Sequence, residues 1–264
     1  MSLLVDKSES PNPELQDRIR EGNLKVFSVL AANYNRLHQE IFNLVEQKRL
    51  DQTLSKVENE IVANNSKALD FGCGTGNVTR LLLGHGFEVT AIDISPDMLS
   101  ILSRRLSSYI KARRLTIALA DDPDTVGGEY SLIALYSVLH HLPDPIQYMA
   151  SLARHVKIGG VLMVDHESKR PNPRRLYALY RASNSFLRRA AVFPHKSPSH
   201  NFALSDFWED KIPWKRIDQN MENAGFKVLG FEYLSHRTIV PNPLYFLMRA
   251  IATDTILRVY LRRQ

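Results

Sequence analysis

A short apolar run, Lys67 to Phe71, carries Asp70 near its end and stops at the turn Gly72-Cys73-Gly74-Thr75-Gly76. A strand that ends in a glycine-rich turn presents backbone N–H groups to a ligand, because glycines let the backbone approach it closely. The dinucleotide fingerprint needs another glycine where Asn77 stands, and no Lys-Ser or Lys-Thr pair follows to grip a phosphate. The spacing therefore predicts a ligand-binding turn of a different kind.

Two adjacent histidines, His140 and His141, follow another apolar run, Tyr130 to Val138. A histidine side chain titrates near pH ~6.5, so either residue can act as a general base on a hydroxyl or an amine. The alternative is that one or both histidines hold the loop by hydrogen bonds. We expect no metal site at the pair, because adjacent side chains diverge and no carboxylate–histidine spacing accompanies them.

The elements that must position these residues alternate along the middle of the chain. Ser95 followed by Pro96 is typical of a helix start. Alternation of this kind predicts a parallel, doubly wound sheet. The strands are expected at 67–71, 87–92, 115–120, 130–138 and 161–164, and the helices between them at 78–83, 97–109 and 143–156.

We expect a flexible leader at 1–23, followed by a single domain at 24–264. Within this domain we expect an N-terminal helical cap at 24–63, with a helix over 24–45, and then the core at 67–165. A lid insertion follows at 166–212, with a helix at 174–189, and then a C-terminal helix and strands at 213–264. The predicted C-terminal elements are a helix at 212–224, strands at 226–234 and 244–251 that pair antiparallel, and a short amphipathic helix at 254–263.

The composition is that of an ordinary soluble protein of 264 residues, 44% hydrophobic and 23% charged, with a net charge of +6. Cys73 is the single cysteine, which excludes an intrachain disulfide and favours a reducing compartment. No secretory signal is visible at the start, and the apolar stretch 244–252 is interrupted by Arg249 and shorter than the ~20 residues of a membrane helix. We therefore expect a cytoplasmic protein.

The order and spacing of the motifs resemble those of the class I S-adenosylmethionine-dependent methyltransferases. The resemblance is strongest to the branch that acts on small molecules such as quinone precursors and natural products, and it covers roughly residues 24 to 165. It implies a Rossmann-like, doubly wound seven-stranded α/β sheet, mostly parallel with an antiparallel last strand. The motifs that carry it are Leu69 to Gly76, Ile92 to Ser95 with Met98-Leu99, Asp121, Val138 to Asp144, and Lys157 to Gly160.

The resemblance also implies the cofactor, S-adenosylmethionine, and contacts to it. Asp93 is expected to accept both ribose hydroxyls, Asp70 to lie near the methionine moiety, and Asp121 to meet the adenine amino group. Asp122 is a further candidate for that amino group or a surface-turn residue, and Tyr34 belongs to a helix that closes over the cofactor or is a core aromatic. The remaining expected contacts are Gly72, Cys73, Gly74, Thr75, Gly76, Ile94, Met98 and Tyr136.

The expected reaction is a direct displacement that moves a methyl group to an O, N or C nucleophile of a small molecule, without a metal. The lid is basic and rich in aromatic residues, and 166–216 carries 11 basic and 4 acidic side chains. It favours a substrate with an anionic group, although its arginines could equally form a solvated helix face. The lid residues expected to bind substrate are Tyr177, Tyr180, Arg181, His195, His200 and Trp208.

Two alternatives stay open. One keeps the chemistry but places a lipid-like or quinone-like substrate at an anionic membrane surface, touched by the basic C-terminal segment with Arg258, Arg262 and Arg263. The other is a binding protein that keeps the fold without turnover. A nucleic-acid substrate is not expected, because the sequence shows no Asn-Pro-Pro-Tyr-like signature after the fourth strand and no separate basic module.

Overall fold

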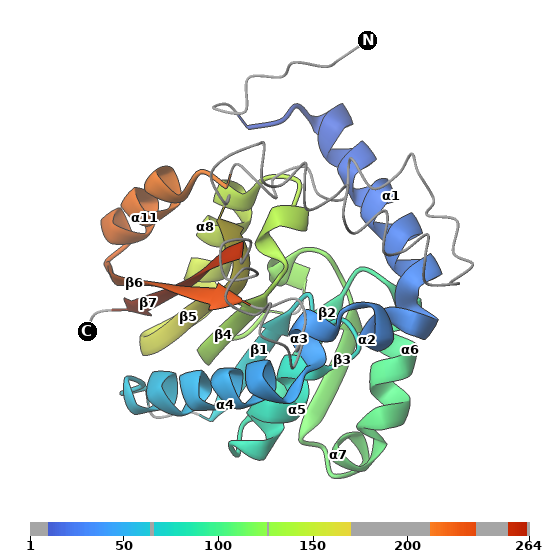
Figure 1. Ribbon diagram of the computed structural model, residues 1–264. Coiled ribbons are helices and arrows are strands. Elements are labelled where there is room, and N and C mark those ends of the chain that lie inside the picture. Colours follow the sequence, from blue (N-terminus) through green and yellow to red (C-terminus); the bar gives the residue numbers. More distant parts are fainter. Residues whose placement is uncertain (1–9, 64–65, 126, 170–211, 236–252, 263–264) are drawn as a thin grey trace, which may run out of the picture.

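The computed structural model describes residues 10–63, 66–125, 127–169, 212–235 and 253–262 (Figure 1). Its centre is a seven-stranded sheet in the order β3-β2-β1-β4-β5-β7-β6. The sheet is parallel except for β7, which runs antiparallel to both β5 and β6. The predicted fold is therefore confirmed. The strands are β1 Lys67–Phe71, β2 Glu88–Asp93, β3 Leu115–Leu119, β4 Tyr130–Tyr136, β5 Val156–Lys169, β6 Phe226–Ser235 and β7 Thr253–Arg262.

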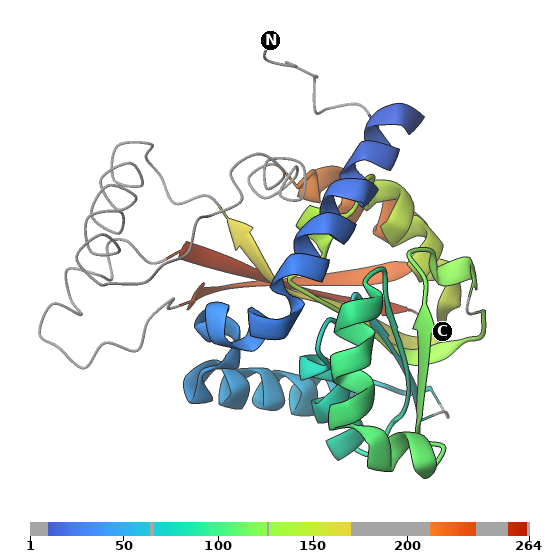
Figure 2. The same ribbon diagram turned by 90° about the vertical axis from the view of Figure 1, so that its right-hand side faces the viewer.

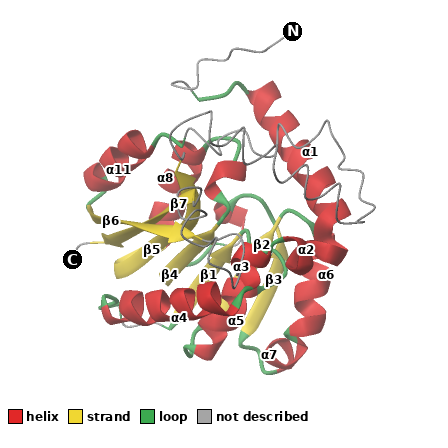
Figure 3. Ribbon diagram, in the orientation of Figure 1, coloured by secondary structure: helices red, strands yellow, loops and turns green. Residues whose placement is uncertain are grey.

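Helices cover both faces of the sheet, as Figures 2 and 3 show. Alternate residues of β4 divide between two apolar clusters. Leu132 and Ala134 pack with α4 (Leu44–Asn59), α5 (Asn77–Gly84) and α6 (Pro96–Arg105). Ile133 and Leu135 pack with α8 (Pro145–His155) and α11 (Trp214–Asn223). This two-sided burial explains why β4 is a continuous apolar run. The helices after β1 are α5 Asn77–Gly84, α6 Pro96–Arg105, α7 Ser107–Lys111, α8 Pro145–His155 and α11 Trp214–Asn223.

The helices before the sheet differ from the prediction. Residues 13–23 are not a leader, because α1 spans Pro13–Leu30 and Asn12 caps it by accepting a hydrogen bond from the Leu15 backbone N–H at 2.9 Å. The single helix expected over 24–45 is wrong, since Asn43 starts a new helix by capping it in the same way. The segments after α1 are a 3₁₀ turn at Ala31–Asn33, α2 Tyr34–Leu37, α3 Gln39–Phe42 and α4 Leu44–Asn59.

The C-terminal prediction also needs correction. The amphipathic helix expected at 254–263 is wrong, because β7 lies between β5 and β6 and buries Leu257 and Val259 on one face and Tyr260 on the other. A strand covered on both faces lacks the simple alternation that would identify it. The helix expected at 174–189 and the strand expected at 244–251 lie outside the described residues. Within the described part of the chain, no helix combines the length and apolar character that a membrane span requires.

Candidate functional site

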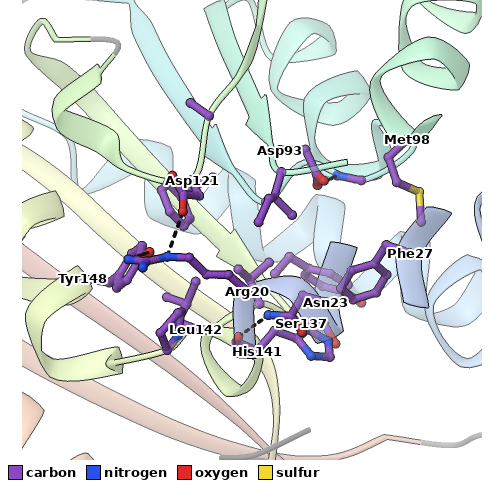
Figure 4. Close-up of a pocket in the computed structure, with 18 of the residues that line it drawn as sticks. Arg20, Asn23, Phe27, Asp93, Met98, Asp121, Ser137, His141, Leu142 and Tyr148 are labelled. Carbon is purple, nitrogen blue, oxygen red and sulfur yellow. Dashed lines mark hydrogen bonds and ion pairs between the residues drawn. The ribbon is translucent and has the colours of Figure 1, made fainter. Parts of the chain in front are cut away.

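A pocket opens at the carboxyl ends of the parallel strands, with α1 across one side of it (Figure 4). It contains about 710 Å³ of empty space, part of which is open to solvent. This is the edge where open α/β sheets bind their ligands. The sequence-predicted residues that line it are Tyr34, Gly72, Gly74, Asp93, Ile94, Met98, Asp121, Tyr136 and His141.

The glycine turn between β1 and α5 depends on backbone conformations that other residues rarely adopt. Gly74 and Gly76 have φ values of 51° and 87°. A Cβ on Gly76 would lie 2.9 Å from Leu102 Cγ, so this glycine lets α6 pack against the turn. A Cβ on Gly74 would meet no atom within 4 Å, and Gly74 faces the pocket. The turn therefore leaves backbone and open space where a ligand can approach.

Asp93 ends β2 with a carboxylate that the backbone holds in place. Its Oδ2 accepts a hydrogen bond from Gly74 N and its Oδ1 accepts one from Ser95 N, both at 2.8 Å. Burial raises the pKa of Asp93, and the backbone N–H groups oppose that rise. Each carboxylate oxygen can accept more than one hydrogen bond, so Asp93 can also receive a ligand hydroxyl.

Asp70 lies beneath the turn and does not line the pocket. It is 1% exposed and accepts a hydrogen bond from Thr79 Oγ1. Burial raises its pKa to about 7, against the lowering effect of the Thr79 hydrogen bonds. Its role beside the methionine moiety stays a prediction. The other predicted residues that do not line the pocket are Cys73, Thr75, Gly76, Asp122 and His140.

Asp121 lines the pocket and forms an ion pair with Arg20, which is not among the predicted site residues. Arg20 of α1 places its Nε 3.0 Å from Asp121 Oδ2, and its Nη2 lies 3.4 Å from Tyr148 Oη. Both members of the ion pair are partly exposed, at 35% and 41% of their side chains. Arg20 therefore connects α1 to the loop after β3 and to α8.

Two more residues of α1 line the pocket without having been predicted to do so. Asn23 donates a hydrogen bond from Nδ2 to the His141 carbonyl oxygen at 2.6 Å. Phe27 packs edge-on against the His141 ring, with 5.0 Å between ring centroids. Arg20, Asn23 and Phe27 are three and four residues apart, which places them on one face of a helix. The spacing indicates a shared helix face in the sequence, but it does not show that the face covers a pocket.

The two histidines after β4 have different surroundings. His140 is buried and its Nδ1 lies 2.7 Å from Glu167 Oε2. Glu167 is 0% exposed, and its other oxygen accepts hydrogen bonds from Val138 N and Leu139 N. His141 lines the pocket, with its ring centroid 3.9 Å from that of His140. Glu167 is not among the predicted site residues, because position 167 falls in the segment expected to form the lid.

A register shift in β5 between Val164 and Glu167 brings this carboxylate to the loop. His166, inside the shift, has a φ of 60° and stacks on Tyr136 at 5.0 Å. Left-handed backbone at a residue other than glycine is strained, and such strain is concentrated at functional sites. The extra residue therefore turns Glu167 toward the histidines and His166 toward the pocket wall.

Tyr136 is held in place by a side chain of α4. Its hydroxyl donates a hydrogen bond to Glu46 Oε1 of α4 at 2.7 Å. Arg49 contacts the same carboxylate with Nη2 at 2.6 Å and reaches Asp165 Oδ2 at 2.8 Å. Asp165 is 0% exposed and Glu46 is 6% exposed. A buried, charged network thus fixes one wall of the pocket.

Two arginines of the basic C-terminal segment, Arg258 and Arg262, make contacts within the protein. Arg258 lies over the Trp214 ring at 5.4 Å and its Nε is 3.5 Å from Asp218 Oδ2. Arg262 donates to the Val156 carbonyl oxygen at the end of α8. Contact with a membrane stays a prediction.

In the described ranges, no group of three or more His, Cys, Asp or Glu side chains could hold a metal ion. Outside the described residues lie Tyr177, Tyr180, Arg181, His195, His200, Trp208 and Arg263.

Comparison with known proteins agrees with this geometry. Residues 69–162 match the family model described as a methyltransferase domain. The chain is 34% identical over 97 residues to the ubiquinone biosynthesis O-methyltransferase of Hydrogenovibrio crunogenus, covering 36% of this chain and 40% of that protein. It is 31% identical over 122 residues to the protein of that name from Marinobacter nauticus, covering 45% and 51%. The chain thus spans about half or less of these relatives.

Solved structures show the same fold at low sequence identity. The magnesium protoporphyrin IX methyltransferase of Synechocystis PCC 6803 with bound SAH has a TM-score of 0.56 at 16% identity, covering 92% of this chain and 100% of that chain. The N-methyltransferase NodS of Bradyrhizobium japonicum, in complex with S-adenosylhomocysteine, has a TM-score of 0.57 at 15% identity and the same coverage. By its sheet order and its solved neighbours, this chain has the fold of the class I S-adenosylmethionine-dependent methyltransferases, and its residues 69–162 match a methyltransferase domain.

Proposed function

We propose that this protein transfers the methyl group of S-adenosylmethionine to a hydroxyl oxygen of a small molecule. The observation that carries the proposal is the convergence of the glycine turn, Asp93, Asp121 and His141 on one pocket at the carboxyl edge of the sheet. Pockets that bind small molecules are typically concave and combine an apolar lining with a few polar groups, as this one does.

The chemistry of the pocket fits the cofactor. Asp93 offers acceptors for the ribose hydroxyls, and Asp121 offers one for the adenine amino group. Ile94 and Met98 supply an apolar surface for the adenine ring between them. The open space at Gly74 leaves room for the ligand beside the turn. In this arrangement the Asp121 carboxylate contacts both the Arg20 guanidinium and the adenine amino group.

When bound, S-adenosylmethionine supplies an electrophilic methyl carbon on its sulfonium sulfur. The chain's contribution is to hold the acceptor oxygen in line with that carbon and to exclude water. Positioning of this kind can contribute about 7–11 kcal/mol to the lowering of the barrier. The side chains of α1 cover the pocket, and Tyr136 is fixed at its wall by Glu46, so both sides restrict the space available to the acceptor.

We assign the general base to His141, which lines the pocket, and a positioning role to His140. A hydroxyl acceptor loses its proton as the new C–O bond forms, so a neutral imidazole near it is useful. His140 donates its Nδ1 hydrogen to Glu167, and this hydrogen bond anchors the loop that carries His141. The buried carboxylate also accepts two backbone N–H groups of that loop.

The choice of an oxygen acceptor rests on the relatives, which are named ubiquinone biosynthesis O-methyltransferases. By analogy, we propose a hydroxylated quinone precursor or a similar phenol as the substrate class. The test is transfer of labelled methyl from S-adenosylmethionine to a panel of catechols and hydroxylated quinone precursors. We expect transfer to oxygen, which falls about a hundredfold in His141→Gln. Cofactor binding without transfer to any O, N or C acceptor would favour a binding protein instead.

A second candidate places the same reaction at a membrane surface. Four aliphatic side chains of the N-terminal helices are exposed: Val29 at 68%, Leu37 at 45%, Leu44 at 85% and Val45 at 65%. Exposed apolar side chains in one region are typical of interaction surfaces. In a flotation assay with anionic vesicles, this candidate expects binding by the wild type and loss of binding in Leu44→Ser/Val45→Ser. If the wild-type protein does not bind the vesicles, the membrane candidate is wrong and the proposal of a small-molecule substrate in solution remains.

A further inference from the structure

Asn23 stands out among the pocket residues because half of its amide is unused. The residue is 6% exposed and lies in the middle of the α1 face that covers the pocket (Figure 4). Its Nδ2 donates to the His141 carbonyl oxygen at 2.6 Å. Its Oδ1 is buried and meets no hydrogen-bond donor among the described residues.

The orientation of this amide is fixed by its partner. A backbone carbonyl oxygen only accepts hydrogen bonds, so the Asn23 atom facing His141 must be the NH2 group and the other atom must be the acceptor oxygen. Buried polar atoms without a partner are uncommon in folded proteins and call for an explanation. At the wall of a ligand pocket, an unpaired acceptor points to a donor on the ligand.

We propose that Asn23 Oδ1 accepts a hydrogen bond from bound S-adenosylmethionine and from its demethylated product, S-adenosylhomocysteine. The inference rests on the proposed function and adds a cofactor contact from α1. Both ligands carry the required donors in their ribose hydroxyls, adenine amino group and α-ammonium group. The neighbours of Asn23 agree with a ligand at this point, since Arg20 and Phe27, on the same helix face, also line the pocket.

The contact would connect the cofactor to the loop of the proposed base. Asn23 holds the His141 carbonyl with one end of its amide and the ligand with the other. Filling the pocket would therefore fix α1 and the His141 loop together. Asn23 is thus a positioning residue: its contact with the bound cofactor helps to hold the His141 loop in place before the acceptor reacts.

Two variants distinguish the role of the amide oxygen of Asn23 from that of its NH2 group. The affinity of each variant for S-adenosylhomocysteine is measured by calorimetric titration. Asn23→Asp keeps an acceptor at Oδ1 and loses the donor to His141, whereas Asn23→Leu has similar size and loses both. We expect the dissociation constant to rise about tenfold or more in Asn23→Leu, and to stay within about threefold of wild type in Asn23→Asp. Leu24→Ala, which changes the neighbouring residue that is 39% exposed, is the matched control and should leave affinity unchanged.

Equal weakening in Asn23→Asp and Asn23→Leu would assign the whole effect to the His141 contact and overturn the proposal. Unchanged affinity in Asn23→Leu would overturn it as well. If Asn23→Leu fails to fold by circular dichroism, Asn23→Ala replaces it, with the same expected loss. A wild-type protein that does not bind S-adenosylhomocysteine would instead refute the proposed function, so the two failures are distinguishable.

Discussion

The two long helices that precede the sheet, α1 and α4, are attached to the molecule in different ways. α4 places Leu50, Leu54 and Val57 in a core cluster against the sheet. Among the described residues, the buried apolar side chains of α1 belong to neither of the two core clusters. At the pocket, α1 contacts the rest of the fold through polar atoms of Arg20 and Asn23 and through the Phe27 ring.

This difference in attachment indicates that α4 is part of the rigid scaffold and that α1 responds to the ligand. Local opening is easiest where few apolar contacts and partly exposed polar contacts hold an element. α4 is held by a buried charge network and by core packing, so its position should not depend on the cofactor. α1 borders the cofactor pocket itself, so we expect its stability to rise when the pocket is filled.

The largest expected effect comes from breaking the network of α4. Glu46→Ala removes the carboxylate that accepts from Arg49 and Tyr136, and leaves the half-buried guanidinium with fewer partners. Breaking a buried ion pair costs about 3–5 kcal/mol, and we expect the free energy of unfolding to fall by about 3 kcal/mol. Urea denaturation measures it, with Glu21→Ala as an exposed control. A loss below about 1 kcal/mol would mean that α4 is not anchored by this network.

The next effect contrasts the two helices directly by hydrogen exchange. Saturating S-adenosylhomocysteine should slow amide exchange in α1 about tenfold or more, because ligand binding stabilises the closed form. Exchange in α4 at residues 50–57 should change by less than about twofold, since none of these residues lines the pocket. Equal protection of both helices would contradict the distinction between scaffold and responsive cover.

A smaller effect is expected from the ion pair of α1. Arg20→Ala removes a contact to Asp121 whose partners are both about a third exposed or more. Such pairs contribute about 0–1 kcal/mol, and salt screens them. We expect a loss of about 0.5 kcal/mol in the stability of the ligand-free protein, and a smaller loss in high salt. A salt-independent loss would indicate that Arg20 acts through packing of its aliphatic stem.

The smallest effect is a pH dependence between α4 and the end of α5. His85 Nδ1 lies 3.0 Å from Glu58 and Nε2 lies 3.1 Å from Asp51. Burial disfavours the charged imidazole, but the hydrogen bonds to these carboxylates outweigh it and raise the pKa of His85. A raised pKa contributes stability that is complete below about pH 6.5 and is lost as the pH rises through the folded value.

We therefore expect wild type to be more stable than His85→Gln by about 0.5 kcal/mol near pH ~6, and the difference to vanish near pH ~9. Thermal or urea denaturation of both proteins at the two pH values provides the measurement. A stability difference that grows with pH would reverse the sign and show that His85 is held in its neutral form.

Much of the fold could be predicted because local signals and packing agree. The glycine turn, the Ser95-Pro96 helix start and the apolar run of β4 each have one physical interpretation, and the structure places all of them as expected. β7 was missed because a strand buried on both faces carries no alternation, and its arginines suggested an amphipathic helix. The contacts of Arg258 and Arg262 arise only from the pairing of distant strands.

The pocket was partly predictable for a similar reason. Asp93 ends a strand and Asp121 follows one, so their positions at the sheet edge could be inferred from the chain alone. Asn23 and Arg20 come from a helix far away in sequence, and nothing local shows that α1 crosses the pocket. Glu167 depends on a register shift in β5, which the sequence does not reveal.

The central claim, that this pocket binds the methyl donor through Asp93, is tested most directly by calorimetric titration with S-adenosylhomocysteine. The account predicts saturable binding to wild type, weakening of about a hundredfold or more in Asp93→Ala because charged hydrogen bonds to the ribose are lost, and unchanged binding in the exposed control Asp97→Ala. Wild-type affinity in Asp93→Ala, or no binding by the wild type, would contradict it.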